Sequence, residues 1–519
     1  MRLSFNTAGP CIPGEHYMVP PGRRLGEVLE LIDERKFFTL TAGRQTGKTT
    51  SAQWLVQHLN GTGKWCAMHV DVQNARDTDS PFHAFKIIRE NLDHAVQRDL
   101  PDVGVPRATA RKLNPSRSFL LRYLRDVAAR APHPVVILFD EVDSLIGKAM
   151  VTFLTQLRLG YIDRARTPFP ASVVLIGQRQ VRDYAVSKRD QRALSWLGTC
   201  SPFNITAEPK TIAPFTEPDV QELLEQHTTA TGQRFEAEAV ARIYELGQGH
   251  PWLTNAMADQ IVRRDVQDRS VAITATHVDA AKETIILERR SHIDSLVAKL
   301  REDRVRRIIG PMIAGSMPDG SLLDDDLAYV LGLGLVRTQG RGGGLEIANP
   351  IYREVIPRAL THATQITIVV NPPSYVRKDG SLDIGKLMAD WQAFWRKDGH
   401  LAAEGFGYRE SGPHLMLMAF LQRIVNGGGR IEREYGLGRG ALDLLVCWKD
   451  EQHAIELKIR RDTETETEAL DQVAGYLDRL GLGDGWLVMF DLRKEIAWQD
   501  KHFVREIEHA GKQIRIVGC

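Results

Sequence analysis

The sequence predicts an α/β protein of several domains, with a parallel sheet in its N-terminal core and a second α/β unit at its C-terminal end. Between residues 36 and 205, short apolar runs alternate with amphipathic stretches of helical period, which is typical of a parallel sheet covered by helices on both faces. Beyond residue 380, strand patterns and helical patterns occur together again. At 519 residues the chain is also too long for a single hydrophobic core.

The strands of the N-terminal core are expected where apolar residues dominate short segments. Helical patterns lie between these expected strands, for example over residues 80–96. The segments are FFTLTA (37–42), CAMHVDV (66–72), VVILFD (135–140) and SVVLIG (172–177). We therefore expect four buried strands whose carboxyl ends meet at one edge of the sheet.

Changes of pattern divide the rest of the chain. After the core the pattern becomes helical, and then helices are followed by two strand-like runs around the turn GRGGG, which favours a winged helix. A structural extension of the lid is the alternative for this part. The expected parts are an N-terminal segment (1–35), the α/β core (36–205), a helical lid (206–290), the winged helix (291–362), a linker (363–380) and a C-terminal α/β domain (381–519).

Composition excludes some classes of protein and leaves others open. The formal net charge of +1 neither demands nor excludes a nucleic acid partner, because a basic patch can lie on a neutral protein. The five cysteines are scattered, which favours neither a disulfide framework nor a zinc site. The N-terminus lacks the pattern of a signal peptide, and no apolar run approaches the length of a membrane span. We expect a cytoplasmic protein without a membrane partner.

A phosphate-binding loop follows the first expected strand and precedes a helical pattern. It has the pattern G-x-x-x-x-G-K-[ST] with alanine in place of the first glycine. In such a loop the backbone N–H groups surround the phosphates, and the helix N-terminus adds positive potential. Lys48 is expected to reach the β- and γ-phosphates of ATP, and Thr49 to bind Mg²⁺; a chance match is the alternative. The expected nucleotide-binding residues are Ala42, Gly43, Arg44, Gln45, Thr46, Gly47, Lys48, Thr49 and Thr50.

Two carboxylates complete this predicted site at the end of the strand 135–140. Asp140 and Glu141 follow five apolar residues, so they are expected at the sheet edge where phosphates bind. We expect Asp140 to hold Mg²⁺ through water and Glu141 to orient or deprotonate the attacking water.

These motifs resemble those of the AAA-like P-loop ATPases, near the signal-transduction ATPases with numerous domains. The resemblance covers roughly residues 15–360 and rests on RQTGKTT, VVILFDEVD, VLIGQRQVRDY and LGQGHPWLTNA. It implies a P-loop ATPase core that works as a nucleotide-driven switch, with Gln178 sensing the γ-phosphate and Pro251 near the base. Proline at the first position of a helix explains Pro251 equally well. Arg179 and Arg182 are candidates for an arginine finger, with solvated surface arginines as the alternative.

A second group of candidate residues lies in the C-terminal domain. Glu456 follows Asp443 by thirteen residues, and Lys458 comes two residues later. Side chains alternate along a strand, so Glu456 and Lys458 project to one side, and a neighbouring strand can bring Asp443 beside them. Two carboxylates suit Mg²⁺, which can polarise a phosphate while the lysine orients or activates water. The sequence predicts a metal site of Asp443 and Glu456 here.

This arrangement resembles the PD-(D/E)xK nuclease superfamily over roughly residues 395–495, which implies a restriction-endonuclease-like domain. The resemblance implies that Gln472 and Tyr476 are catalytic residues and that Glu410 is a further metal ligand. Packing of the helix is the alternative for Gln472 and Tyr476, and a degenerate, non-cleaving fold is the alternative for the whole domain. A glycine-rich basic run is expected to face a phosphate backbone with Arg430, Arg433 and Arg439.

Together these features predict an ATP-gated DNA nuclease with ATP and Mg²⁺ as cofactors and nucleic acid, DNA in the first place, as partner. Assembly into a homo-oligomer is one way in which ATP could act on the nuclease. Such a fusion suits prokaryotic defence or DNA repair. A nucleotide-dependent switch or scaffold that only binds nucleic acid is the second hypothesis, and a loader-type ATPase that recruits a partner is the third.

Overall fold

The computed structural model describes most of residues 3–519. At a few further positions within helices and strands, among them 441–443, it describes the backbone alone. The residues outside the description are 77, 79, 107–117, 178–208, 314–324, 340–343, 368–374, 397–411, 426–428, 438–439, 461–463, 492 and 494–495.

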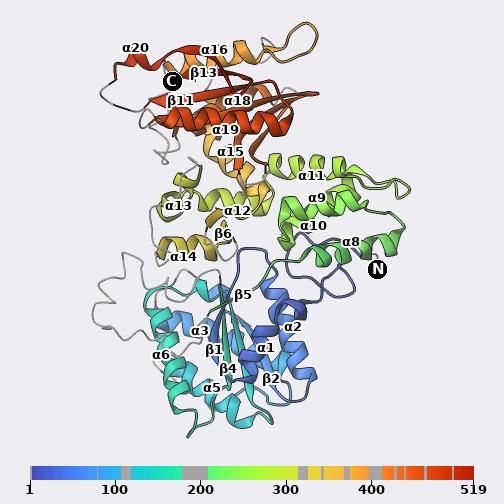
Figure 1. Ribbon diagram of the computed structural model, residues 1–519. Coiled ribbons are helices and arrows are strands. Elements are labelled where there is room, and N and C mark those ends of the chain that lie inside the picture. The colour runs from blue at the N-terminus through green and yellow to red at the C-terminus, as the bar shows by residue number, and fades with distance from the viewer. Residues whose placement is uncertain are drawn as a thin grey trace. The chain divides into compact units, whose positions relative to one another are not determined.

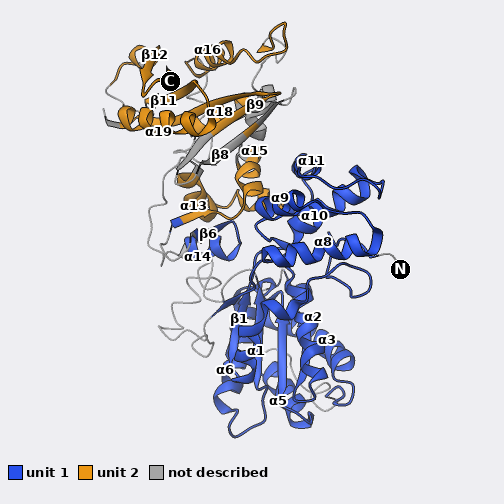
Figure 2. Cartoon of the chain, turned by 45° about the vertical axis from the view of Figure 1, so that its right-hand side comes forward, with its two compact units in different colours: residues 1–292, 321–344 blue, residues 293–320, 345–519 orange. Residues whose placement is uncertain are grey.

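The chain forms two compact units, which Figure 2 colours separately. Unit 1 comprises residues 1–292 and 321–344, and unit 2 comprises residues 293–320 and 345–519. Two of the three points at which the chain passes from one unit to the other lie within α12 (Ser291–Lys299) and within β7 (Gly344–Ile347). Both points lie in the segment for which a winged helix is expected, and that expectation stays a prediction.

A five-stranded sheet forms the centre of unit 1, and each of its neighbouring pairs is parallel. Its order is β2-β3-β4-β1-β5. Long runs of valine, isoleucine, leucine and phenylalanine suit strands that are buried on both faces, and the four expected strands are confirmed. The strands are β1 (Phe37–Thr41), β2 (Cys66–Asp71), β3 (Val135–Asp140), β4 (Ser172–Gly177) and β5 (Lys210–Thr211).

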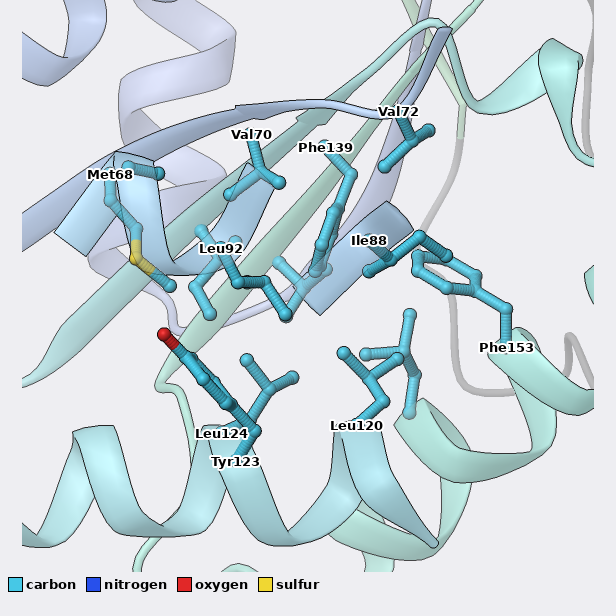
Figure 3. Close-up of a cluster of buried hydrophobic side chains, with 14 of the residues drawn as sticks. Met68, Val70, Val72, Ile88, Leu92, Leu120, Tyr123, Leu124, Phe139 and Phe153 are labelled. Atoms are coloured by element: carbon cyan, nitrogen blue, oxygen red, sulfur yellow. The ribbon is translucent and has the colours of Figure 1, made fainter. Parts of the chain in front are cut away.

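Helices cover both faces of this sheet, as Figure 1 shows. Successive side chains of β3 alternate between two cores: Phe139 packs with α3, α5 and α6, and Leu138 packs with α1 and α2. Figure 3 shows part of the first core, where Val70 and Phe139 meet Leu92. The helices are α1 (Gly26–Asp33), α2 (Lys48–Gly61), α3 (Pro81–Asp99), α5 (Phe119–Arg130) and α6 (Gly147–Asp163), with short 3₁₀ turns at η1 (Pro21–Arg24), η2 (Gln73–Ala75) and η3 (Val142–Ser144).

Helices also fill the segment expected to form the lid. A capping box between Thr216 and Asp219 starts α8, and Gly232 ends it with a φ of 79° in the left-handed region. The helices are α8 (Glu217–Thr231), α9 (Ala237–Gly247), α10 (Pro251–Gln260), the π-helical turn η5 (Ile261–Asp265) and α11 (Ala275–Leu287). Unit 1 also contains α14 (Asp325–Gly332) and β6 (Val336–Gln339).

Unit 2 contains a six-stranded mixed sheet in the order β12-β13-β11-β10-β9-β8. The strands β8, β9 and β10 are antiparallel neighbours, whereas β10 and β11 run parallel. The strands are β8 (Gly429–Leu437), β9 (Gly440–Trp448), β10 (Glu451–Arg460), β11 (Asp484–Asp491), β12 (Val504–His509) and β13 (Lys512–Gly518). The helices are α13 (Asp303–Ile313), α15 (Pro350–Thr367), α16 (Ile384–Phe394), α18 (Gly412–Val425), α19 (Glu464–Leu480) and α20 (Trp498–Lys501).

The sheet of unit 2 also lies between two layers of helices. Leu444 packs in the core that includes α16 and α18, while its neighbour Leu445 packs in the core under α19. The fully buried Trp391 of α16 is at the centre of the first core. None of the helices that the structure describes has both the length and the apolar composition needed to cross a membrane.

Candidate functional site

The candidate nucleotide site of unit 1 begins where β1 ends. Residues 42–47 form a loop, and α2 starts at Lys48. Gly47 has a φ of 89° and Gln45 a φ of 57°, so the loop turns through two left-handed residues. Gly43 cannot carry a side chain without a clash, because a Cβ atom there would lie 2.9 Å from the carbonyl oxygen of Leu333. The loop is therefore tight, and a side chain at Gly43 would force the backbone around it to shift.

Lys48 lies at the centre of this loop. Its Nζ donates hydrogen bonds to the carbonyl oxygens of Ala42, at 3.0 Å, and Gly43, at 2.9 Å. The side chain is almost fully buried, and this burial lowers the pKa of Lys48. The ammonium group thus sits against the loop backbone, next to the N-terminus of α2, where an anion is stabilised.

Asp140 ends β3 and meets two side chains from other elements. Its Oδ2 accepts hydrogen bonds from the hydroxyl of Thr49, at 2.9 Å, and from Nε2 of His69, at 3.2 Å. Its Oδ1 accepts one from the backbone N–H of Glu141, at 2.9 Å. Burial acts to raise the pKa of Asp140, but the His69, Thr49 and backbone hydrogen bonds hold it below its ordinary value. A carboxylate beside a hydroxyl is a set of oxygen donors that fits Mg²⁺.

Glu141 follows immediately and has unusual backbone geometry. Its φ of 55° places a non-glycine residue in the left-handed region, which costs energy and is often found at functional sites. Burial raises the pKa of Glu141, while the charge of Lys48 acts in the opposite direction. A carboxylate with a raised pKa, close to the phosphate-binding loop, is suited to accept a proton from water.

Comparison with known protein families supports this interpretation. The family model described as an AAA domain matches residues 32–184. Two similar solved structures are the Walker-type ATPase PABY2304 of Pyrococcus abyssi and the RuvB Holliday junction branch migration motor of Thermotoga maritima. The first is 13% identical, covers 68% of this chain and 99% of its own, and has a TM-score of 0.48. The second is 15% identical, covers 65% of this chain and 92% of its own, and has a TM-score of 0.32. No curated protein matches the chain.

Residues 32–184 form an AAA-like P-loop ATPase domain. The structure brings its loop, Thr49, Asp140 and Glu141 together as the sequence predicts. Thr50 accepts a hydrogen bond at 3.0 Å from the N–H of Cys11, so the N-terminal segment contacts α2. Gln178, Arg179 and Arg182 lie outside the described residues.

Two histidines contact the loop of this ATPase domain. The resemblance implies that the segment around Pro251 lies near the nucleotide, but sequence reasoning gave neither His250 nor His292 a role. The ring of His250 is hydrogen-bonded to the backbone of Arg44, and burial lowers the pKa of His250 to about 4. Nδ1 of His292 lies 2.9 Å from Oε1 of Gln45. The two histidine rings are 4.6 Å apart, and His292 stacks on Trp252. The motif LGQGHPWLTNA contains His250 and Trp252, but it does not indicate their contact with His292, which depends on how distant segments fold together.

Pro251 occupies the first position of α10, as the alternative for this residue predicts. His250, just before it, accepts a hydrogen bond from the N–H of Leu253 and caps the helix. Gly249 has a φ of 71°, and its carbonyl accepts a hydrogen bond of 2.8 Å from Phe215. These contacts fix the start of α10. A contact of Pro251 with the base of the nucleotide stays a prediction.

In unit 2 the candidate residues of β10 form an ion pair in which the carboxylate is buried and the lysine is partly exposed. Nζ of Lys458 lies 2.9 Å from Oε1 of Glu456, whose side chain is only 2% exposed. Ile455 and Leu457 pack on the α16 and α18 side, whereas Ala454 packs under α19. By alternation Glu456 and Lys458 lie on the α19 side of the sheet. The expectation that the two residues share a face is confirmed.

Asp443 lies in β9, and only its backbone is described. The pair Ile455 and Leu444 defines the antiparallel register of β9 and β10. Asp443 and Glu456 each lie one position beyond this last pair of the two strands. Glu410 and Arg439 lie outside the described residues, and Arg430 and Arg433 have only their backbones described, in β8. Within the described part of the chain, no group of three or more acidic, histidine or cysteine side chains could hold a metal ion.

Gln472 and Tyr476 lie one turn apart on α19 but differ in burial. Gln472 is exposed. Tyr476 is buried in the core under α19, with the guanidinium of Arg479 5.9 Å from its ring. Packing therefore accounts for part of the environment of Tyr476, and a catalytic role for either residue stays a prediction.

Proposed function

We propose that this protein is an ATPase whose ATP-binding state controls a Mg²⁺-dependent nuclease in unit 2, with DNA as its substrate. The ATPase part rests on the AAA domain match and on the assembly of Lys48, Thr49 and Asp140 around one loop. The observation that carries the nuclease part is the pairing of the buried Glu456 with Lys458 on β10, beside the strand that contains Asp443.

In the ATPase domain, the loop N–H groups and the N-terminus of α2 would bind the phosphates. Lys48 would leave its loop carbonyls to neutralise charge on the β- and γ-phosphates. Thr49 and Asp140 would hold Mg²⁺, which supplies charge neutralisation during phosphoryl transfer. Glu141 would orient the attacking water and take its proton, for which its raised pKa suits it.

In unit 2, Glu456 and Asp443 would hold a metal ion that polarises the scissile phosphate. Lys458 would orient the attacking water, because its ammonium group is already held beside Glu456. Gln472, Tyr476 and Glu410 are further candidates from the resemblance. Burying an ion costs free energy that its partner only partly offsets, so an ion pair with a buried carboxylate is weak evidence for a role in stability and fits a functional role.

The proposal is tested by cleavage of single-stranded and duplex DNA with Mg²⁺, with and without ATP. Four proteins are compared: wild type, Lys458→Ala, Lys48→Ala and, as a control, Lys512→Ala, which removes the lysine of another ion pair of unit 2 whose acid is exposed. We expect wild type and Lys512→Ala to cleave DNA in the presence of ATP and Lys458→Ala to lose cleavage. In Lys48→Ala the rate of ATP hydrolysis should fall roughly 100-fold or more. The addition of ATP should then no longer change the rate of DNA cleavage by this variant.

Each outcome decides a different part of the proposal. Cleavage that continues unchanged in Lys48→Ala would refute the gating by ATP and leave the nuclease. ATP hydrolysis without any cleavage of DNA or RNA would refute the nuclease and favour a nucleotide-dependent switch that binds nucleic acid. Loss of cleavage in Lys512→Ala as well would indicate damage to the fold of unit 2.

A further inference from the structure

A buried histidine, His69, lies beside the carboxylate of Asp140 in unit 1. His69 is in β2, next to β3, and its side chain is 7% exposed. Because an ionised carboxylate only accepts hydrogen bonds, the Nε2–H of His69 is the donor to Asp140 at 3.2 Å. A polar side chain inside an apolar strand requires such a partner, and the segment CAMHVDV contains this signal.

The backbone of His69 is itself fixed by the end of α3. Its N–H donates to Oδ2 of Asp99 at 2.9 Å, and its carbonyl accepts from Arg98 at 2.7 Å. Arg98 and Asp99 also pair with each other at 2.7 Å. The imidazole is therefore held from a part of the sheet that does not belong to the phosphate-binding loop.

The three hydrogen bonds to Asp140 have different relations to a bound metal ion. The Thr49 hydroxyl, which now donates to Asp140, is the group that would turn its oxygen towards Mg²⁺. The Glu141 N–H is fixed by the chain direction and restrains only Oδ1. The His69 bond is the side-chain contact that can keep Oδ2 in place when Thr49 is engaged by the metal.

We propose that His69 is a positioning residue that holds the Asp140 carboxylate ready for Mg²⁺. The inference rests on the nucleotide site of the proposed function and adds to it a residue on β2. It follows that His69 contributes to the gain in nucleotide affinity that Mg²⁺ provides and contributes little to nucleotide binding without metal.

The test measures binding of a fluorescent ADP analogue to the full chain, with Mg²⁺ and with EDTA. His69→Leu keeps the approximate size of the side chain and removes the donor. We expect it to reduce the Mg²⁺-dependent gain in affinity about tenfold, because loss of a group that orients a metal ligand typically has such an effect. Affinity in EDTA should change less than about twofold by the same principle.

Conservative variants separate positioning from packing. In His69→Gln the amide nitrogen is as many bonds from Cβ as Nε2 of histidine, so this variant should recover most of the Mg²⁺ effect. The side chain in His69→Asn is one carbon shorter, so this variant should not recover the Mg²⁺ effect. If His69→Leu does not fold, the comparison of His69→Gln with His69→Asn tests the inference instead. His94→Leu, at an exposed position of α3, is the control.

An unchanged Mg²⁺-dependent gain in His69→Leu or His69→Asn would overturn the inference. Equal losses in EDTA and in Mg²⁺ would also overturn it, because they would assign His69 to the stability of the site. A wild-type protein that binds no nucleotide in either condition would instead refute the proposed function itself, and the inference with it.

Discussion

The two candidate sites both contain a buried carboxylate at a sheet, but they stabilise it differently. Asp140 of unit 1 accepts hydrogen bonds from α2, from β2 and from its own backbone. Glu456 of unit 2 is paired with a cation two residues along its own strand. The first carboxylate keeps its negative charge among hydrogen-bond donors and suits an added metal ion, whereas the second already has a cation beside it. The difference shows how one chemical group, the carboxylate, can be held in two kinds of site.

Replacing Gly249 should break the bracing of the unit 1 site by its lid. A Cβ atom at this position would lie 1.9 Å from the carbonyl oxygen of Phe215, and the φ of 71° adds strain. We expect Gly249→Ala to lower the local stability of α10 by more than about 3 kcal/mol. Hydrogen exchange of the peptides that cover α10 measures this change.

The matched control for this glycine is Gly63→Ala. Gly63 has a φ of 65° and nothing within 4 Å of a built Cβ atom, so only the backbone strain of about 1 kcal/mol applies. Equal effects of the two variants would mean that the contact with Phe215 is not needed to hold the lid.

His250 makes the stability of unit 1 depend on pH. Its folded-state pKa of about 4 lies below the ordinary value of 6.5, so between these pH values the unfolded chain binds the proton and the folded chain does not. Stability is therefore complete above pH 6.5 and falls as the pH drops to 4, by about 2 kcal/mol at pH 5. Chemical denaturation at pH 7 and at pH 5 measures the free energy of unfolding. Between these two pH values, this free energy should fall less in His250→Asn than in wild type. Asparagine keeps the helix cap.

His83→Asn provides the control for the histidine, because His83 is exposed on α3. It should leave the difference between pH 7 and pH 5 as in wild type. A loss of the same size in wild type and His250→Asn would show that the loop does not depend on this ring.

Lys458→Met gives the smallest expected effect and tests the site of unit 2. Removing the cation beside Glu456 should destabilise unit 2 by about 1 kcal/mol, since Lys458 is partly exposed. If Glu456 is a metal ligand, Mg²⁺ should restore part of the lost stability, and it should not do so in Glu456→Gln. Thermal denaturation with and without Mg²⁺ measures both effects.

The pair of Lys512 with Asp478 offers a control at the same distance of 2.9 Å, with the acid 70% exposed. Lys512→Met should cost less than about 0.5 kcal/mol and respond to Mg²⁺ no differently from wild type. No recovery by Mg²⁺ in Lys458→Met would assign the Glu456–Lys458 pair to structure.

Contiguous features were predictable from the sequence. The four strands of unit 1 follow from apolar runs, the loop 42–47 from local pattern, and the shared face of Glu456 and Lys458 from alternation. Contacts between distant segments were not predictable. His250 and His292 contact Arg44 and Gln45 of the loop from segments more than 200 residues away, and no periodicity contains that information. His69 is an intermediate case, because its position in an apolar strand indicates a partner but does not identify it.

The division of unit 1 into two stretches of chain has a consequence for synthesis on the ribosome. Leu333, whose carbonyl oxygen closes the space over Gly43, belongs to the returning stretch 321–344. The loop is made about 290 residues earlier, so it cannot reach its final packing until the first part of unit 2 has also left the ribosome. A nascent chain that ends at residue 292 has the loop and the lid but lacks the segment that packs against Gly43. The nucleotide site therefore matures only after synthesis of the second unit has begun.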